Sequence, residues 1–383
     1  MLEGGDEVRL KREATAQHPV HPRFSTGCDA APVRHPRASS SVHRLWVVAL
    51  LGATAAVSAA CGGASGGSSP APASPAPFAG ASDAAGALQD RFVAVVDRVG
   101  PSVVQISTSQ GLGSGVVFDA HGDIVTNAHV VAGATSFRVT FADGVTLPAS
   151  LVSAYAPNDL AVVRVDPGAA ALTPASFGDS SRLEVGAIVL AVGNPLGLRS
   201  SVTDGIVSGF RTGVPEGNGV VLPAVIQTSA AINPGNSGGA LVDVDGRVIG
   251  IPTLGVVDPN DGGAVPGIGF AIPSNTVKDL AGQIVAHGAV VDSKRAYLGV
   301  QVASDTTHGA VVIAVVPGGP AGRAGLVPGD RITSLNGTPV RTATDLSSIL
   351  AGLEPGASVH LELVRAGGAA AALPVTLGTY PGS

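Results

Sequence analysis

Short apolar runs separated by Gly, Pro, Asn or Asp fill most of the chain between residues 88 and 290. Runs bounded by turn residues, with little helical periodicity between them, are typical of antiparallel β-barrels or sandwiches. About 200 residues of this pattern predict two six-stranded barrels, the fold of a mainly β protein. The runs expected to form strands are 102–107, 115–118, 124–126, 137–141, 160–165, 188–192, 205–208, 225–227, 241–244 and 248–251.

Helical spacing of apolar residues occurs at both ends of this β-rich region. Residues 88–97 show it weakly, and residues 274–287 show it clearly, with Gly288 following as a stop signal. Either Ser274 or Asn275 is suited to cap the start of the second helix. These helices set the limits of a first folded domain, which we expect at residues 88–290.

A second, smaller pattern of strands follows at residues 296–378. Its turns contain Pro-Gly-Asp and Asn-Gly, which favour tight reversals between strands. We expect strands at 298–302, 310–316, 331–335, 359–364 and 373–377, with helices at 320–324 and 344–353. The segment therefore predicts a small β-sandwich or barrel with two helices.

The chain ahead of these domains has three unlike parts. Residues 1–44 are polar, residues 45–61 contain an uncharged apolar run, and residues 62–87 form a Gly/Ser/Pro/Ala linker. A basic flank before an apolar run that is short for a membrane span predicts a secretory signal. Small residues before Cys61 resemble the cleavage box of bacterial lipoproteins, in which that cysteine carries the lipid. An uncleaved membrane anchor and a buried helix are the alternatives.

Two details of this region bear on the signal. Ser58 stands where lipoprotein boxes usually have Leu. Residues 1–44 are also longer than the basic part of an ordinary signal peptide. Either they are cytoplasmic or synthesis starts near Val42, which would leave His43 and Arg44 as a short basic segment.

Composition narrows the function classes. With 45% hydrophobic residues, 53 Gly and 28 Pro in 383 residues, the chain is globular and rich in turns. A formal net charge of −6 argues against nucleic-acid binding, which needs clustered Lys and Arg. The two cysteines, Cys28 and Cys61, precede both predicted domains, which therefore contain no disulfide. Since there is no metal-ligand cluster and no phosphate-binding loop, we expect neither metal nor cofactor.

Ser237 lies in the glycine-rich stretch N-P-G-N-S-G-G-A. Glycines beside a serine allow a tight turn that exposes the hydroxyl and brings backbone N–H groups close to a reacting carbonyl. A lone stretch of this kind is more often an ordinary polar turn. A base and a carboxylate elsewhere in the chain would give it chemical meaning.

His129 and Asp159 are the best candidates for these partners. Of the nine histidines, His129 stands just past a predicted strand, within T-N-A-H-V-V, and Asp159 enters another strand within N-D-L-A-V-V. A carboxylate can fix the tautomer of an imidazole that takes the proton of a serine. Taken singly, each is more often a structural residue. The order His129, Asp159, Ser237 is that of chymotrypsin-type proteases, which agrees with the predicted barrels.

These three blocks resemble the catalytic blocks of the HtrA (Deg) family of envelope serine proteases. The connecting segments 178–197, 205–209 and 267–274 are similar to the family's as well. The resemblance covers residues 88–378 and implies a chymotrypsin-like double barrel, a PDZ domain and usually a homotrimer. It also implies ATP-independent degradation of unfolded envelope proteins. Ser229 departs from the family, which usually has Asp at this position.

The same resemblance assigns the parts of the site. The oxyanion hole would be formed by the N–H groups of Gly235 and Ser237, with Asn236 between them. Ile232 and the segment containing Leu254 and Gly255 would line the S1 pocket. With no acidic residue at its floor near Ala231, this pocket is expected to take small or medium aliphatic side chains rather than Lys or Arg.

In the second domain, the resemblance identifies a loop that binds C-terminal carboxylates. Its residues are Tyr297, Leu298, Gly299 and Val300, and Leu346 and Ile349 would line the peptide groove. A small β-domain with no peptide site fits the pattern nearly as well.

Arg211, in the loop after residues 205–208 of the first domain, is a candidate for relaying peptide binding to the active site.

We therefore expect an exported, membrane-tethered serine endopeptidase that acts on misfolded proteins or on proteins recognised by their C-termini. The alternative is a chaperone or peptide-binding module whose protease site is silent at rest. A PDZ scaffold alone is less consistent with the chain, because a scaffold has no need of three catalytic residues in matching contexts.

Overall fold

A computed structural model describes residues 79–194, 201–216, 220–233, 235–253, 265, 267–304 and 309–382 of the protein. The predicted signal or anchor segment, both cysteines and most of the linker lie outside these residues. Among the helices that are described, none combines the length and the apolar character needed to cross a membrane.

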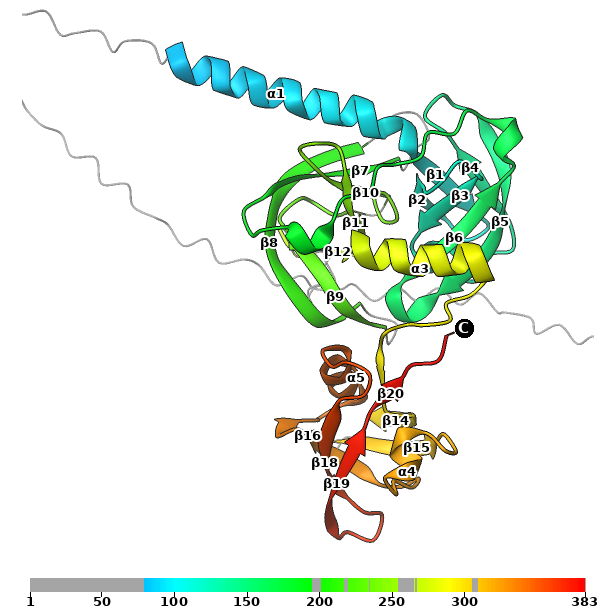
Figure 1. The fold of residues 1–383 in the computed structure, drawn as a ribbon, viewed down its shortest axis with the longest axis vertical. Helices are drawn as coiled ribbons and strands as arrows, with labels where there is room; N and C mark the ends of the chain where they lie inside the picture. Colours follow the sequence, from blue (N-terminus) through cyan, green and yellow to red (C-terminus); the bar gives the residue numbers. More distant parts are fainter. Residues whose placement is uncertain are drawn as a thin grey trace, which may run out of the picture. The chain divides into compact units, whose positions relative to one another are not determined.

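Two closed six-stranded barrels are present, as the sequence predicts (Figure 1). They follow helix α1 (Ala79–Val99), which is longer than the predicted helix and begins within the segment expected to be linker. The first barrel has the strand order β1-β2-β3-β6-β5-β4 and the second the order β10-β11-β12-β9-β8-β7. In the first barrel the strands are β1 (Val103–Thr108), β2 (Leu112–Val117), β3 (Asp123–Thr126), β4 (Phe137–Thr140), β5 (Thr146–Tyr155) and β6 (Leu160–Val165). In the second they are β7 (Ile188–Gly193), β8 (Ser201–Pro215), β9 (Val221–Thr228), β10 (Ala240–Asp243), β11 (Val248–Pro252) and β12 (Gly269–Pro273).

Each of the ten predicted runs overlaps one of these strands, whereas β5 and β12 were missed. β5 mixes Thr, Ser, Ala and Pro, and most of its side chains are partly or fully exposed, so it has no apolar run to reveal it. β12 is only five residues long and begins with Gly. Short helical turns connect the strands: η1 (Gly100–Ser102), α2 (Ala128–Val131), η2 (Ala156–Asn158), η3 (Pro167–Ala169) and η4 (Ser180–Arg182).

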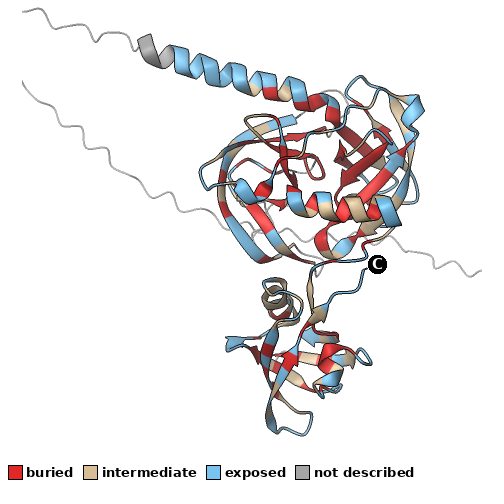
Figure 2. Cartoon of the chain, viewed as in Figure 1, coloured by how far each residue is buried: buried red, intermediate tan, exposed pale blue. Residues whose placement is uncertain are grey.

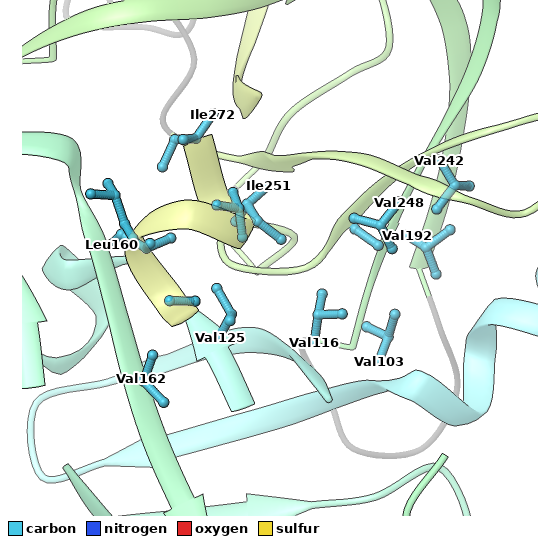
Figure 3. Close-up of a cluster of buried hydrophobic side chains, with 14 of the residues drawn as sticks. Val103, Val116, Val125, Leu160, Val162, Val192, Val242, Val248, Ile251 and Ile272 are labelled. Atoms are coloured by element: carbon cyan, nitrogen blue, oxygen red, sulfur yellow. The ribbon is translucent and has the colours of Figure 1, made fainter. Parts of the chain in front are cut away.

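One hydrophobic core joins the two barrels (Figure 3). Val103, Val116 and Leu160 of the first barrel belong to the same cluster as Val242 and Ile251 of the second. Burial therefore concentrates inside and between the barrels, whereas α1 is exposed along most of its length (Figure 2). The connections that meet beside this shared core carry the candidate catalytic residues.

Helix α3 (Ser274–His287) has the predicted bounds, but its N-terminus is satisfied differently from our expectation. Neither Ser274 nor Asn275 is the N-cap, because Pro273 holds that position without a side-chain bond. Instead Ser180 Oγ accepts from the Asn275 N–H at 3.1 Å, and Ser274 Oγ donates to the carbonyl of Gly178 at 3.0 Å. The cap is thus supplied by a segment distant in sequence, whereas Gly288 ends the helix in the left-handed conformation as expected.

The C-terminal part forms a second, smaller β-domain with its own core. Its main sheet has the order β14-β15-β16-β18-β19, with β17 paired to β16, and β13 pairs separately with β20. Helices α4 and α5 confirm the two predicted helices. The bounds are β13 (Ala296–Tyr297), β14 (Val300–Ser304), β15 (Ala310–Val315), α4 (Pro320–Arg323), β16 (Arg331–Leu335), β17 (Thr338–Pro339), α5 (Ala343–Ala351), β18 (Ser358–Val364), β19 (Ala370–Thr376) and β20 (Gly378–Thr379).

Candidate active site

His129 lies on the short helix α2, directly after β3. Asn127, two residues before His129, is fully buried, and its Nδ2 donates to the carbonyl of Asp159 at 3.0 Å. The imidazole is partly exposed, with 26% of its side-chain surface accessible. It is therefore held from one side and open to a substrate on the other.

Asp159 ends the turn η2 with φ of 49°, a left-handed conformation that is uncommon outside glycine. Its carboxylate accepts from the His129 N–H at 2.9 Å and contacts His129 Nδ1 at 2.9 and 3.0 Å. A carboxylate at Nδ1 places the ring proton on that nitrogen in the neutral imidazole. Nε2 is then left as the basic nitrogen, which is the tautomer that a general base requires.

Thr253, just beyond β11, is a third partner of this carboxylate that the sequence did not reveal. Its Oγ1 donates to Asp159 Oδ2 at 2.9 Å, and the residue is 1% exposed. Its carbonyl oxygen lies 3.4 Å from Ser237 Oγ, a distance too long for a strong hydrogen bond. Thr253 therefore contacts both the predicted nucleophile and the predicted orienting carboxylate.

Ser237 is 5% exposed, in a turn fixed by backbone contacts with both barrels. The Ser114 N–H of the first barrel donates to the Ser237 carbonyl at 3.0 Å, and the Gly238 N–H donates to the Pro252 carbonyl of the second barrel at 3.0 Å. Gly238 has φ of 81°, and a Cβ there would lie 2.2 Å from the Ser114 carbonyl oxygen. Only glycine fits this position, which explains part of the motif.

Ser114 was also missed by the sequence reasoning. Its hydroxyl donates to the carbonyl of Gly235 and accepts from the Asn194 N–H at 2.8 Å. The side chain is fully buried. It therefore ties the predicted oxyanion turn to the end of β7 and to the first barrel.

Asn236 holds the same turn from within. Its Oδ1 accepts from the Asn233 N–H at 3.0 Å, and its Nδ2 donates to the Ala231 carbonyl at 3.1 Å. The side chain is buried and serves the loop rather than facing solvent.

The predicted S1 residues are covered only in part. Ile232 is 7% exposed and belongs to the core cluster of the second barrel. It packs so closely against Gly269 that a Cβ on this glycine would lie 2.3 Å from the Ile232 side chain. Leu254 and Gly255 lie outside the described residues.

Glu216, at the end of β8, is an acidic neighbour of the site that no sequence pattern indicated. Ligand-type atoms of His129, Asp159 and Glu216 all lie within 4.8 Å of one another. The first two residues already share hydrogen bonds, and Thr253 bonds the same carboxylate. This set of donors is thus arranged as a hydrogen-bonded pair with an additional carboxylate nearby rather than as an assembled metal site.

Ser229 and Arg211, two further residues singled out from the sequence, each make one described side-chain contact with the backbone. Ser229, where the family usually has Asp, accepts from the Ile206 N–H at 3.0 Å through its hydroxyl and so fixes the β8–β9 pairing. Arg211 is exposed, and its guanidinium contacts the carbonyl of the neighbouring Phe210 at 3.3 Å.

In the predicted PDZ domain, the carboxylate loop expected from the sequence and helix α5 line one small pocket of about 150 Å³. Leu346 lines it as predicted, but Ile349 is not among the described residues that do so, and Leu350 takes its place one residue later. Gly299 has φ of 81° and permits the bend of the loop. The lining residues are Arg295, Ala296, Tyr297, Leu298, Gly299, Val300, Val302, Leu346, Ser347, Leu350, Ala351 and Tyr380.

Comparison with known proteins agrees with both halves of this architecture. A model of the trypsin-like peptidase domain matches residues 113–251, and a model of the PDZ domain matches residues 311–365. The chain is 41% identical over 307 residues to serine protease PepD of Mycobacterium tuberculosis, an alignment that covers 74% of this chain and 65% of PepD. It is 42% identical over 266 residues to periplasmic serine endoprotease DegP of Escherichia coli, covering 67% of this chain and 55% of DegP. The chain thus spans less than two thirds of these curated relatives.

Solved structures give the same result over nearly their whole length. The HtrA-type protease AlgW, solved with a decapeptide, is 32% identical with a TM-score of 0.53, and the match covers 76% of this chain and 99% of AlgW. A serine endoprotease from Yersinia pestis is 33% identical with a TM-score of 0.52, covering 76% of this chain and 98% of the other. The chain therefore belongs to the HtrA (Deg) family of trypsin-like serine proteases that carry a PDZ domain.

Proposed function

We propose that the chain is an ATP-independent serine endopeptidase in which Ser237 is the nucleophile, His129 the general base and Asp159 the residue that orients the base. The observation that carries this proposal is the contact of His129 Nδ1 with the buried Asp159 carboxylate at 2.9 Å. That contact leaves Nε2 to receive a proton, and the turn bearing Ser237 lies against the same Thr253.

In the first chemical step, Ser237 Oγ attacks the carbonyl carbon of the scissile peptide bond while its proton passes to His129 Nε2. The imidazolium formed is stabilised by the adjacent Asp159 carboxylate. Because that carboxylate also accepts bonds from Thr253 and from the His129 N–H, it does not need to move during the step.

The negative charge on the substrate oxygen would be held by the N–H groups of Gly235 and Ser237. In proteases, loss of one such donor lowers the rate by about 10²–10³-fold. His129 then gives its proton to the leaving amine, an acyl-enzyme forms on Ser237, and water repeats the sequence to release it. Ser114 and Asn236 keep the donor turn in place through their bonds to it.

The proposed S1 pocket lies near Ile232 and includes Leu254 and Gly255. An apolar wall without an acidic floor favours small or medium aliphatic side chains at P1. A strong preference of the enzyme for Arg or Lys at P1 in peptide libraries would contradict this assignment.

We further propose that the substrates are misfolded proteins of the bacterial cell envelope and proteins recognised by their C-termini through the PDZ domain. Support comes from the pocket lined by the 297–300 loop and from relatives whose names place them in the periplasm. For this role, the chain would be held by its N-terminus at the outer face of the cytoplasmic membrane. The tether would be either a lipid on Cys61 or an uncleaved anchor. The chain would be assembled as a homotrimer. N-terminal sequencing and intact mass would distinguish a lipidated Cys61 from a retained anchor, and light scattering of the detergent-solubilised chain would test the trimer.

The decisive experiment is hydrolysis of casein by the full chain and by Ser237→Ala. We expect cleavage without ATP and none above background in the variant. Equal cleavage by both would contradict the protease proposal. Suppression of aggregation of an unfolded protein by both proteins, with cleavage by neither, would favour the alternative function of a chaperone or peptide-binding module.

A further inference from the structure

Asn127 holds the N-cap position of helix α2, yet its side chain does not cap that helix. An asparagine at this position usually accepts a hydrogen bond from a backbone N–H of the first helical turn. Here its Nδ2 donates instead to the carbonyl of Asp159 at 3.0 Å, across 32 residues of sequence. Because a carbonyl oxygen can only accept, this bond fixes the orientation of the Asn127 amide.

The N–H group that Asn127 would ordinarily cap is bound by Asp159. The Asp159 carboxylate accepts from the backbone N–H of His129, the second residue of α2, at 2.9 Å. The same carboxylate contacts His129 Nδ1. The two residues therefore exchange bonds: Asn127 binds the backbone of Asp159, and the Asp159 side chain takes over the cap of α2 while it contacts the imidazole.

This exchange leaves one polar atom of Asn127 unpaired. The side chain is fully buried, and its Oδ1 has no hydrogen-bond partner among the described residues. A buried acceptor without a partner destabilises the folded state. An amide kept at this place is therefore better explained by what its Nδ2 holds than by a contribution of Asn127 to stability.

The backbone of Asp159 needs such a constraint because it adopts φ of 49°. Left-handed backbone is unfavourable for a residue with a Cβ and persists where surrounding contacts hold it. The Asp159 N–H donates to the Ala156 carbonyl at 3.0 Å, a bond that lies within the turn η2. The bond from Asn127 to the Asp159 carbonyl ties this turn to the segment that carries His129.

We propose that Asn127 is a positioning residue, which holds the Asp159 backbone in the conformation that directs the carboxylate to His129. Asn127 touches neither the substrate nor the reacting atoms and acts only through Asp159. A displacement of about 1 Å in a catalytic site can lower the rate by about 10²-fold. We therefore expect loss of the Asn127 amide to lower kcat by roughly 10- to 100-fold and to change KM by less than about twofold. The inference rests on the proposed endopeptidase activity.

The test compares the full chain with Asn127→Leu, which has a similar volume but no donor. Fluorogenic peptides with Val at P1 measure kcat and KM, and thermal unfolding measures the melting temperature. The variant loses one hydrogen bond but also the unpaired Oδ1, so its melting temperature should stay within about 5 °C of the wild type while kcat falls. Asn127→Ala, which cannot clash in the space that Asn127 occupies, should show the same fall in kcat.

Asn275→Leu is the matched control. Asn275 Nδ2 donates to Asp179 Oδ1 at 2.7 Å, outside the candidate site. Removal of this donor should lower the melting temperature and leave kcat unchanged, which is the opposite of the result expected for Asn127→Leu.

A double-mutant cycle with Asp159→Asn separates positioning from a general structural role. Because Asn127 acts through the Asp159 carboxylate, Asn127→Leu should lower the residual kcat of Asp159→Asn by less than about twofold. An activated ester substrate makes this residual rate measurable.

Three outcomes would overturn the positioning role. They are equal fold-losses of kcat in the wild-type and Asp159→Asn backgrounds, a loss confined to KM, and a kcat within about threefold of the wild type in both Asn127 variants. Failure of the proposed function itself would appear differently, as peptide hydrolysis that Ser237→Ala does not abolish.

Discussion

Thr253 donates a 2.9 Å hydrogen bond to Asp159 across 94 residues of sequence, and both side chains are buried. This bond and the His129 contacts together fix the carboxylate in one position. Thr253 thereby links β11 of the second barrel to Asp159, the acid that we propose orients the base of the first.

We expect Thr253→Val to lower kcat/KM by about tenfold, since loss of one buried hydrogen bond to a carboxylate is worth about 1.5 kcal/mol. KM should change little, because the substrate does not contact the Thr253 hydroxyl. Thr253→Ser retains the donor and should stay within about threefold of the wild type. Peptide kinetics of the three proteins check this, and a fully active Thr253→Val would show that the bond has no catalytic role.

A substitution at Gly238 tests whether the conformation of the turn that carries Ser237 is required for activity. An Ala there would keep φ of 81° and bring its Cβ to 2.2 Å from the Ser114 carbonyl oxygen, so the turn would have to move. We expect hydrolysis to be abolished and the stability to fall by about 3 kcal/mol or more. Gly144 has φ of 87° with no atom within 4 Å of the added Cβ, so Gly144→Ala is the matched control. It should cost only about 1 kcal/mol and leave activity intact. Similar losses of activity in both variants would contradict this account of the turn.

Sequence reasoning succeeded where the signal was local. Apolar runs between turn residues predicted most barrel strands. His129 and Asp159, each chosen from a short recognisable block, do lie in hydrogen-bond contact, and their catalytic roles with Ser237 stay a proposal. β5 was missed because its partly exposed side chains form no such run. The same local reasoning predicted both bounds of α3 but assigned its N-cap to the wrong residues.

The residues that were missed depend on pairing between distant segments. Ser114 bonds Gly235 across 121 residues, and Ser180 caps α3 from 95 residues away. A buried Ser or Thr next to a strand has no distinctive pattern in one sequence. Glu216 was missed for the same reason, since only the arrangement of the two barrels brings the end of β8 close to His129.

The PDZ pocket leads to a prediction about peptide binding. We expect peptides with a free C-terminal carboxylate to bind at least tenfold more tightly than the same peptides amidated, because the 297–300 loop would bind the carboxylate through backbone N–H groups. Leu350→Ala should weaken binding more than Ile349→Ala, since Leu350 lines the pocket and Ile349 does not. Calorimetry with the Ser237→Ala chain measures both effects without cleavage. Equal affinity for acid and amide would exclude carboxylate recognition at this loop.

Arg295 gives a prediction about the segment that precedes Asp159. Its guanidinium donates to the carbonyls of Pro157 and Val221, and desolvation lowers its pKa below the ordinary value for arginine. Arg295→Met keeps the chain length but leaves these carbonyls without the donor, so we expect a loss of about 1–3 kcal/mol in stability and a lower kcat. Arg295→Lys should recover only part of both, because an ammonium cannot reproduce the planar fork. Thermal unfolding and peptide kinetics test this, and an unchanged kcat in Arg295→Met would show that η2 keeps its position unaided.

The hydrogen bonds of Asp179 lead to a prediction of how the stability of the folded state depends on pH. Bonds from the Ser181 hydroxyl, from Asn275 Nδ2 and from the Ser181 N–H lower the pKa of its carboxyl from 3.8 to about 2, and Lys278 adds a smaller contribution in the same direction. Because the folded pKa lies below the unfolded one, the ionised carboxylate stabilises the folded state above about pH 4. This contribution declines as the pH falls from about 4 to 2 and is absent below that.

Asp179→Asn should therefore melt at a lower temperature than the wild type at pH 6, and the difference should shrink between pH 4 and 2. Asn275→Ala removes one donor to the carboxylate while retaining the acid. In that background the effect of Asp179→Asn at pH 6 should be smaller, because the folded pKa is then closer to the unfolded one. Thermal melts of the four proteins across this range measure the coupling directly. A melting difference that stays constant from pH 6 to pH 2 would mean that Asp179 acts through its shape as a cap and not through its charge.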